Sequence, residues 1–243
     1  MASNVQWSNL ADGIDITDQA FRSSDTCTLI EDYLSDKTLD DVPENVRNCM
    51  SSCCKNNVSQ YRNGVRTLDA LSRREEYKGG IAPEVIEQIR GDCVEKILDG
   101  VAFACRIAER LAHMSSLEVK VFAHKMKGDY NRYAAEVLVS SEKYVEISRN
   151  AYTDAEELAK NLSPQHTLRL GLALNSSVFY YEIMNNSMKA MQVAKDAFAQ
   201  AHVDMEDEDM INPDSANILQ LIKDNMDLWG RKDDSDESTT DDV

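Results

Sequence analysis

The sequence predicts an all-helical protein. Its apolar residues recur at the three-to-four spacing of an α-helix over long stretches, and strict apolar–polar alternation, the mark of a half-buried strand, is not sustained anywhere. Glycine and proline are scarce, with nine and four among 243 residues. We therefore expect long helices packed antiparallel through short loops.

The prolines mark where helices begin. Proline suits the first helical turn because its missing N–H would be unpaired there anyway. Acidic residues follow three of the four, as the helix dipole favours, and Ser163 and Asn212 stand in front of two of them as predicted N-caps. The four prolines are Pro43, Pro83, Pro164 and Pro213.

Three stretches show the clearest helical faces, at residues 94–111, 168–179 and 190–198. Their apolar positions are expected to form the core. We find no fixed-period repeat, so a helical solenoid is not predicted. The last stretch, residues 231–243, has no apolar residue before its final valine and holds six acids and two bases. We predict a helical domain over residues 1–230 and a disordered acidic tail over 231–243.

Composition narrows the class of function. Apolar residues make up 42% and charged residues 28%, as in ordinary globular proteins, while the net charge of −17 argues against nucleic acid or an anionic membrane as a partner. The N-terminus lacks the basic and apolar regions of a signal peptide, and no apolar run approaches the roughly 18 residues of a membrane span. We expect a soluble, cytoplasmic protein.

The cysteines allow two interpretations. The first is a zinc or redox site, and the second is a set of buried, reduced thiols on helices. No pair has C-x-x-C spacing and the four histidines do not cluster with them, which favours the second interpretation, without metal or cofactor. The six are Cys27, Cys49, Cys53, Cys54, Cys93 and Cys105.

Two predicted helices carry a similar arrangement of cations. Lys55 and Arg62 are seven residues apart, which is two helical turns, and Arg66 follows on the same side. Lys125 and Arg132 repeat this spacing. Tyr133 adds a hydroxyl beside the second arginine, and Asp129 and Glu136 each follow a cation by one turn, placed to brace it.

Converging cations of this kind suit a phosphomonoester, which carries a charge of about −1.5 to −2 and three strong acceptor oxygens. A solvated helix face has the same spacing, so spacing alone leaves both interpretations open. No G-x-S-x-G, H-E-x-x-H, P-loop or G-x-G-x-x-G motif is present, and no enzyme is predicted.

Three segments resemble the 14-3-3 family. KMKGDYNRYAAEV, residues 125–137, resembles the signature KMKGDYxRYxAEV. RLGLALNSSVFYYEIM, residues 169–184, resembles RLGLALNFSVFYYEI, and LIKDNMDLW, residues 221–229, is similar to LLRDNLTLW. CCKNNVSQYR, residues 53–62, resembles AYKNVVGARR less closely. The chain is thus identified as a divergent family member, with the resemblance strongest in its C-terminal half.

The resemblance implies nine antiparallel helices in a cup with a concave amphipathic groove. It further implies an adaptor that binds phosphoserine or phosphothreonine peptides, to sequester, relocate or bridge client proteins, with a preference for upstream basic residues. The implied phosphate-binding residues are Lys55, Arg62, Arg132 and Tyr133. The implied peptide-groove residues are Lys125, Leu174, Asn175, Val178, Glu182, Ile218, Leu221, Asn225 and Trp229.

The resemblance also implies a homodimer, whose N-terminal contacts are altered here. The family segment AEQAERYDD corresponds to residues 17–25, where the arginine is kept as Arg22 and the tyrosine becomes Ser23. The acidic partner of that arginine aligns with Gln88. We expect a different apolar patch, drawn from Trp7, Ile14 and Phe21.

Two further hypotheses remain. A helical scaffold of the same fold that binds unphosphorylated partners is the alternative to the adaptor, and the joint presence of the four implied phosphate-binding residues favours the adaptor. A phosphorylated tail is the second hypothesis, because such a tail would occupy the groove of its own or another copy. Its candidate acceptors are Ser235, Ser238, Thr239 and Thr240.

Overall fold

The computed structural model describes the backbone of residues 2–20, 22–35, 42–203 and 212–237. It describes the side chains of residues 9–20, 22, 25–34, 42–202 and 212–231. Within these ranges every regular element is helical, which confirms the all-α prediction. None of the described helices is long and apolar enough to cross a membrane.

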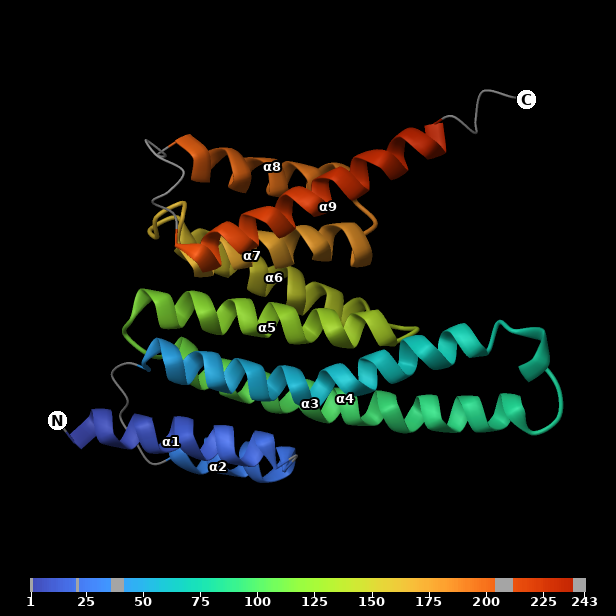
Figure 1. Cartoon of the computed structure of the whole chain (residues 1–243), viewed down its shortest axis with the longest axis horizontal. Helices are drawn as coiled ribbons and strands as arrows, with labels where there is room; N and C mark the ends of the chain where they lie inside the picture. Colours follow the sequence, from blue (N-terminus) through green and yellow to red (C-terminus); the bar gives the residue numbers. More distant parts are fainter. Residues whose placement is uncertain (1, 21, 36–41, 204–211, 238–243) are drawn as a thin grey trace. The chain divides into compact units, whose positions relative to one another are not determined.

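The described residues form nine α-helices and two short helical turns (Figure 1). The α-helices are α1 Ala2–Gln19, α2 Ser23–Ser35, α3 Glu44–Leu71, α4 Ala82–Ala112, α5 Leu117–Val137, α6 Glu142–Ala159, α7 Thr167–Val178, α8 Ser187–Val203 and α9 Pro213–Glu237. A 3-10 turn, Glu75–Tyr77, precedes α4, and a π-helical turn, Phe179–Ile183, follows α7.

The chain divides into two compact units, Met1–Ser148 and Arg149–Val243, each with its own core. The division falls inside α6. The tail that we predicted from residue 231 begins inside α9, which continues to Glu237, and residues 238–243 lie outside the described part. The limit of the helical domain at residue 230 stays a prediction.

The first unit is built around α3, α4 and α5, which lie side by side (Figure 1). Their apolar faces form one core, together with residues of α1 and α2. The predicted face of residues 94–111 supplies Ile97, Val101, Ala104, Ala108 and Leu111 to this core. Gly100 allows the close approach of α3 and α4, because a Cβ there would lie 2.5 Å from Val58 Cγ2.

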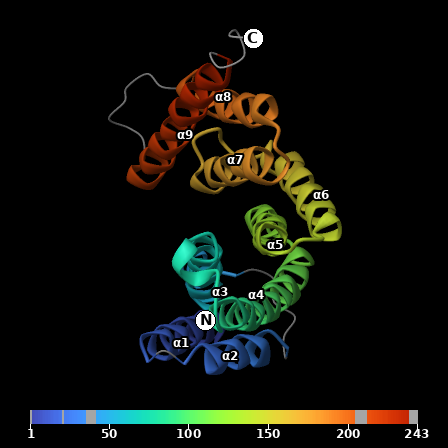
Figure 2. The ribbon, with the colours of Figure 1, turned by 90° about the vertical axis from the view of Figure 1, so that its right-hand side faces the viewer.

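The second unit packs α7, α8 and α9 together (Figure 2). Its core includes Ala190, Ala194, Ile222 and Trp229, and the Trp229 ring stacks on Tyr181 with 4.7 Å between centroids. Cores of this kind hold the helices in place because each helix buries one apolar stripe.

One of the two predicted N-caps in the second unit is wrong, and the other is confirmed. Helix α7 is capped by His166, whose Nδ1 accepts the backbone N–H of Leu168, whereas the hydroxyl of Ser163 accepts from Gln165 in the preceding turn. Proline at 164 therefore lies before the helix and not in its first turn. The Asn212 cap is confirmed, because Asn212 Oδ1 accepts the N–H of Asp214 at 2.9 Å.

One residue predicted for the apolar dimer patch, Ile14, is wrongly placed. Ile14 is only 2% exposed and belongs to the core of the first unit, so it cannot contribute to an exposed patch. The side chains of Trp7, Phe21 and Ser23 lie outside those that the structure describes. Arg22 pairs with Asp25 on the same helix turn at 2.5 Å, and Gln88 is exposed on α4.

Candidate functional site

Helices α3 and α5 run in the same direction, which sets the register of the two cation rows. Near their starts Arg47 Nη2 of α3 lies 2.9 Å from Glu118 Oε2 of α5. Farther along, Arg62 of α3 pairs with Glu136 of α5. Residue numbers therefore rise together in the two helices. Because the Lys–Arg spacing is seven residues in both, the two rows lie level with each other.

The arginines of the two rows meet at one aromatic ring. The Cζ atom of Arg62 lies 3.7 Å from the centroid of the Tyr133 ring, and that of Arg132 lies 4.7 Å from it. Both side chains are largely buried, at 12% and 8% exposure. A guanidinium next to an aromatic ring is attracted to its negative face. The structure thus brings together three of the four residues predicted to bind phosphate.

One carboxylate holds the arginines of α3. Glu136 Oε2 accepts from Arg62 Nε at 3.2 Å and from Arg62 Nη2, while Glu136 Oε1 accepts from Arg66 Nε at 2.7 Å. We had expected Glu136 to brace Arg132, one turn earlier on its own helix. The bond to α3 forms instead because α3 places two guanidiniums against this side of α5.

The electrostatics of Glu136 reflect these partners. Burial alone would raise the pKa of the Glu136 carboxyl, but the hydrogen bond and charge of Arg62, with those of Arg66, outweigh it and lower the pKa below its ordinary value of 4.5. The carboxylate therefore stays ionised at neutral pH, and Arg62 is held in a fixed position.

A second carboxylate holds the cations of α5. Asp129 Oδ2 lies 2.7 Å from Lys125 Nζ, and Asp129 Oδ1 lies 3.7 Å from Arg132 Nη2. Asp129 is buried, and its pairing with Lys125 is the brace that the spacing predicts. Lys125, Asp129 and Arg132 thus form a chain of charges along one face of α5.

Lys55 completes the set at a greater distance. It lies two turns before Arg62 on α3, level with Met126 and hence near Lys125 in the register of the two helices. Its side chain is exposed. Among the contacts of the described side chains, none joins Lys55 to Arg62 or Arg132. The site therefore consists of a compact group of two arginines and a tyrosine, with two lysines beside it.

The local charge of the site is positive although the chain is acidic. Five cations, Lys55, Arg62, Arg66, Lys125 and Arg132, face two carboxylates, Glu136 and Asp129. The excess positive charge suits an anion of charge near −2, and arginine forks can bind two of its oxygens at once. Arg66 and Glu136 were noted beside the cation rows but not among the implied phosphate-binding residues; the bond that joins them depends on a contact between helices that sequence spacing does not reveal.

The second unit holds the residues predicted for the peptide groove, apart from Lys125. Leu174, Val178 and Ile218 are half-buried and pack on the core formed with Trp229. The other members differ in exposure: Asn175 and Asn225 are half-buried, whereas Glu182 and Leu221 are exposed. Glu182 belongs to the π-helical turn, an irregularity that is frequent at functional sites.

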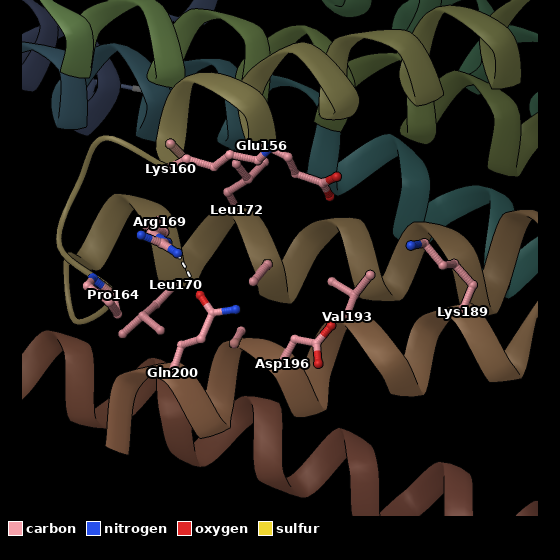
Figure 3. Close-up of a pocket in the computed structure, with 13 residues that line it drawn as sticks. Glu156, Lys160, Pro164, Arg169, Leu170, Leu172, Lys189, Val193, Asp196 and Gln200 are labelled. Carbon is pink, nitrogen blue, oxygen red and sulfur yellow. Dashed lines mark hydrogen bonds between the residues drawn. The ribbon is translucent and has the colours of Figure 1, made fainter. Parts of the chain in front are cut away.

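A separate pocket of about 290 Å³ lies in the second unit among α6, α7 and α8 (Figure 3). Two of its cations are engaged: Arg169 donates to Gln200 Oε1 at 2.6 Å and to the carbonyl of Leu162 at 2.7 Å, and Lys160 pairs with Glu157. Burial raises the pKa of Glu156 at its edge, against a hydrogen bond with Ser176 and the charge of Lys189. None of the predicted groove residues lines this pocket.

The cysteines lie on α2, α3 and α4 as free thiols, with Cys53 and Cys54 fully buried. Among the side chains that the structure describes, no group of three or more His, Cys, Asp or Glu residues is placed to hold a metal ion.

Comparison with known proteins identifies relatives along most of the chain. Residues 13–230 match the family described as 14-3-3 protein. The chain is 40% identical over 190 residues to 14-3-3 protein 2 of Entamoeba histolytica, covering 75% of this chain and 79% of that protein. It is 37% identical over 222 residues to 14-3-3 protein zeta of Bombyx mori, covering 88% of each. It is 35% identical over 238 residues to the 14-3-3-like protein GF14 nu of Arabidopsis thaliana, covering 94% of this chain and 88% of the relative.

Proposed function

Since this chain belongs to the 14-3-3 protein family, whose members are non-enzymatic adaptors, we propose that it binds client proteins through phosphoserine or phosphothreonine. The phosphoryl group occupies the site formed by Arg62, Arg132 and Tyr133, with Lys55 and Lys125 beside it. The adaptor then sequesters, relocates or bridges its clients in the cytoplasm.

The observation that carries this proposal is the meeting of two largely buried arginine side chains at the Tyr133 ring. A charge-assisted hydrogen bond is worth about 1.5–3 kcal/mol. An unmodified serine offers the guanidiniums no negative charge and only one hydroxyl oxygen, so affinity depends on the phosphoryl group. The acidic character of the chain favours clients with arginine or lysine near the modified residue.

Residues of the second unit supply the rest of the peptide site in this proposal. The amides of Asn175 and Asn225 hydrogen-bond the extended client backbone, and Leu174, Val178, Ile218 and Leu221 receive client side chains. Glu182 and Trp229 help to hold this geometry. The support is chemical: half-buried amides and apolar side chains occur together on α7 and α9.

The deciding experiment is a titration by fluorescence anisotropy with a labelled peptide that has arginines before a phosphoserine, and with its unmodified twin. We expect the phosphorylated peptide to bind at least about 100-fold more tightly, because two or more charge-assisted bonds are lost with the phosphate. The substitution Arg132→Ala should weaken the binding of the phosphorylated peptide by about tenfold or more.

Lys127→Ala is the matched control, since Lys127 lies on the same helix but pairs with Glu109 at 3.2 Å. It should bind like the original chain. Equal binding of both peptides would instead favour the alternative, a scaffold of the same fold for unphosphorylated partners, and full affinity of Arg132→Ala would remove this residue from the site.

The family generally forms dimers, and we propose a homodimer with altered contacts for this chain. Ile81, Val85 and Ile89 recur every four residues at the start of α4 and are all exposed, at 73%, 40% and 45%. Ile16 of α1 is exposed as well. An apolar stripe of this kind favours burial in an interface. In this proposal the exposed stripe forms the apolar part of the dimer interface, in place of the buried Ile14.

A phosphorylated tail is proposed as an internal competitor for the site. Ser235 belongs to α9, but its side chain, like Ser238, Thr239 and Thr240, lies outside the described part of the chain. The support is therefore the sequence alone, in which Arg231 and Lys232 precede Ser235 and acids surround the other three.

A further inference from the structure

A pair of thiols joins α2 to α3 in the first unit, away from the phosphate site. Cys27 on α2 and Cys53 on α3 lie near enough to shift the pKa of each other's thiol, that of Cys27 down and that of Cys53 up. Asn57, one turn after Cys53, donates its Nδ2–H to Cys27 Sγ at 3.8 Å. Cys27 is half-buried, and Cys53 is buried in the core. Two neighbouring thiols on adjacent helices are candidates for a disulfide.

Cys27 is also open to a small reactant. It lines a cavity of about 400 Å³ that lies among α2, α3 and α4. The walls carry polar groups, among them Asn57, Lys96 and Arg106, and Arg106 is held by Glu31 at 2.9 Å. Cys53 does not line this cavity. A reactant in the cavity therefore meets Cys27 first.

The environment favours the thiolate of Cys27. The hydrogen bond from Cys53 lowers the pKa of Cys27 most strongly and Arg106 acts in the same direction, although burial and Glu31 oppose them. By contrast, burial is the main cause that raises the pKa of Cys49, Cys54 and Cys105. Since the thiolate is the nucleophile, Cys27 differs from these thiols in both access and reactivity.

We propose that Cys27 is a site of oxidation by hydrogen peroxide and that Cys53 resolves it to a disulfide between α2 and α3. The Cys27 sulfur attacks one peroxide oxygen, the O–O bond breaks, and hydroxide leaves and is protonated to water, which gives a sulfenic acid. The Cys53 sulfur then attacks the sulfenic sulfur, its proton and the departing hydroxide form water, and the S–S bond closes. Two thiols lose two electrons and two protons, and one peroxide becomes two waters.

Peroxide treatment of the reduced full-length chain tests this proposal. After a few molar equivalents of hydrogen peroxide, free thiols are blocked with N-ethylmaleimide, and the protein is digested and analysed by mass spectrometry. We expect a Cys27–Cys53 link as the main product, located by fragmentation because Cys49, Cys53 and Cys54 are close in sequence. A higher midpoint of thermal unfolding, reversed by dithiothreitol, should accompany it.

Variants separate the two roles. The Cys27→Ser variant should form no link and should consume peroxide more than about tenfold more slowly than the original chain. The Cys53→Ala variant should stop at a sulfenic acid on Cys27, which dimedone traps. Cys105→Ser is the matched control, because it removes a partly buried thiol of raised pKa, and it should behave like the original chain. An unmodified Cys27 while other thiols react, or a main link to Cys49 or Cys54, would overturn the assignment. These readouts need no phosphopeptide, so they stand apart from the proposed adaptor function.

Discussion

At the scale of single residues, Glu136 is the acid on which the arrangement of the site depends. It binds Arg62 and Arg66 of α3 from its position on α5. Replacing it with glutamine should destabilise the protein by about 1–3 kcal/mol at neutral pH, because its charge-assisted bond to the largely buried Arg62 is weakened. The midpoint of urea unfolding at pH 7 measures this loss.

The effect of Glu136→Gln should depend on pH. The folded-state pKa of Glu136 is lowered, so the stabilisation is present above the ordinary pKa of 4.5 and is lost as the pH falls through the lower folded value. The gap in stability between variant and original chain should therefore narrow below about pH 4.5. Glu109→Gln, in an exposed pair with Lys127, should cost less than about 1 kcal/mol, and an equal loss there would contradict the role of Glu136.

The site shows what spacing can predict at this scale. Seven-residue spacing predicts that Lys55 and Arg62 share one helix face and that Lys125 and Arg132 share another, because helical geometry fixes which residues share a face. The meeting of Arg62 and Arg132 at Tyr133 depends on how α3 packs on α5, which spacing does not reveal. The partner of Glu136 was not predictable in this way, since Arg132 on its own helix and Arg62 across the interface are both within reach of its side chain. Ile14 was placed wrongly because an apolar residue on a helix is equally suited to a core and to an exposed patch.

At the scale of helices, α9 is held to the second unit by Trp229. Its side chain is 3% exposed and stacks on Tyr181 beyond the end of α7. Trp229→Ala should cost about 3–5 kcal/mol, because a large aromatic group leaves a cavity in the core. Leu228→Ala is the neighbouring control: its side chain is 50% exposed, and the loss should stay within about 0.5 kcal/mol. Thermal unfolding followed by circular dichroism compares the two, and similar losses would argue against an anchoring role for the tryptophan.

The helix boundaries show where sequence signals end. Proline at 213 and Asn212 predicted the start of α9, since both residues act locally on the first turn. Ser163 failed as a cap because the chain makes a further turn before Thr167, and His166 then lies at the helix start. The π-helical turn after α7 was not predicted, because the apolar pattern of residues 168–179 continues into it without a break.

At the scale of the whole molecule, the exposed stripe on α4 bears on assembly. Ile89→Asp should place a charge in the proposed interface and shift the mass in solution from about twice that of the 27.3 kDa chain to that of a single chain. Light scattering after size-exclusion chromatography measures this mass. Val139→Asp alters a nearly fully exposed residue outside the stripe and should leave the dimer intact; dissociation of both variants, or of neither, would contradict the assignment.

The tail offers a second test at this scale. A chain phosphorylated between residues 231 and 243 should bind the phosphopeptide more weakly than the unmodified chain, because its own phosphate competes for the site. A chain ending at residue 230 should bind as the unmodified chain does. Tail phosphorylation without any change in affinity would reject self-binding.

The position of the two arginines against Tyr133 limits what can imitate a phosphate here. Glu136 and Asp129 already offer Arg62 and Arg132 one planar, singly charged carboxylate each. A client with aspartate or glutamate in place of the modified serine brings only another group of that kind, with neither the second negative charge nor the third oxygen. We therefore expect such phosphomimetic clients to bind this protein as weakly as unmodified clients do.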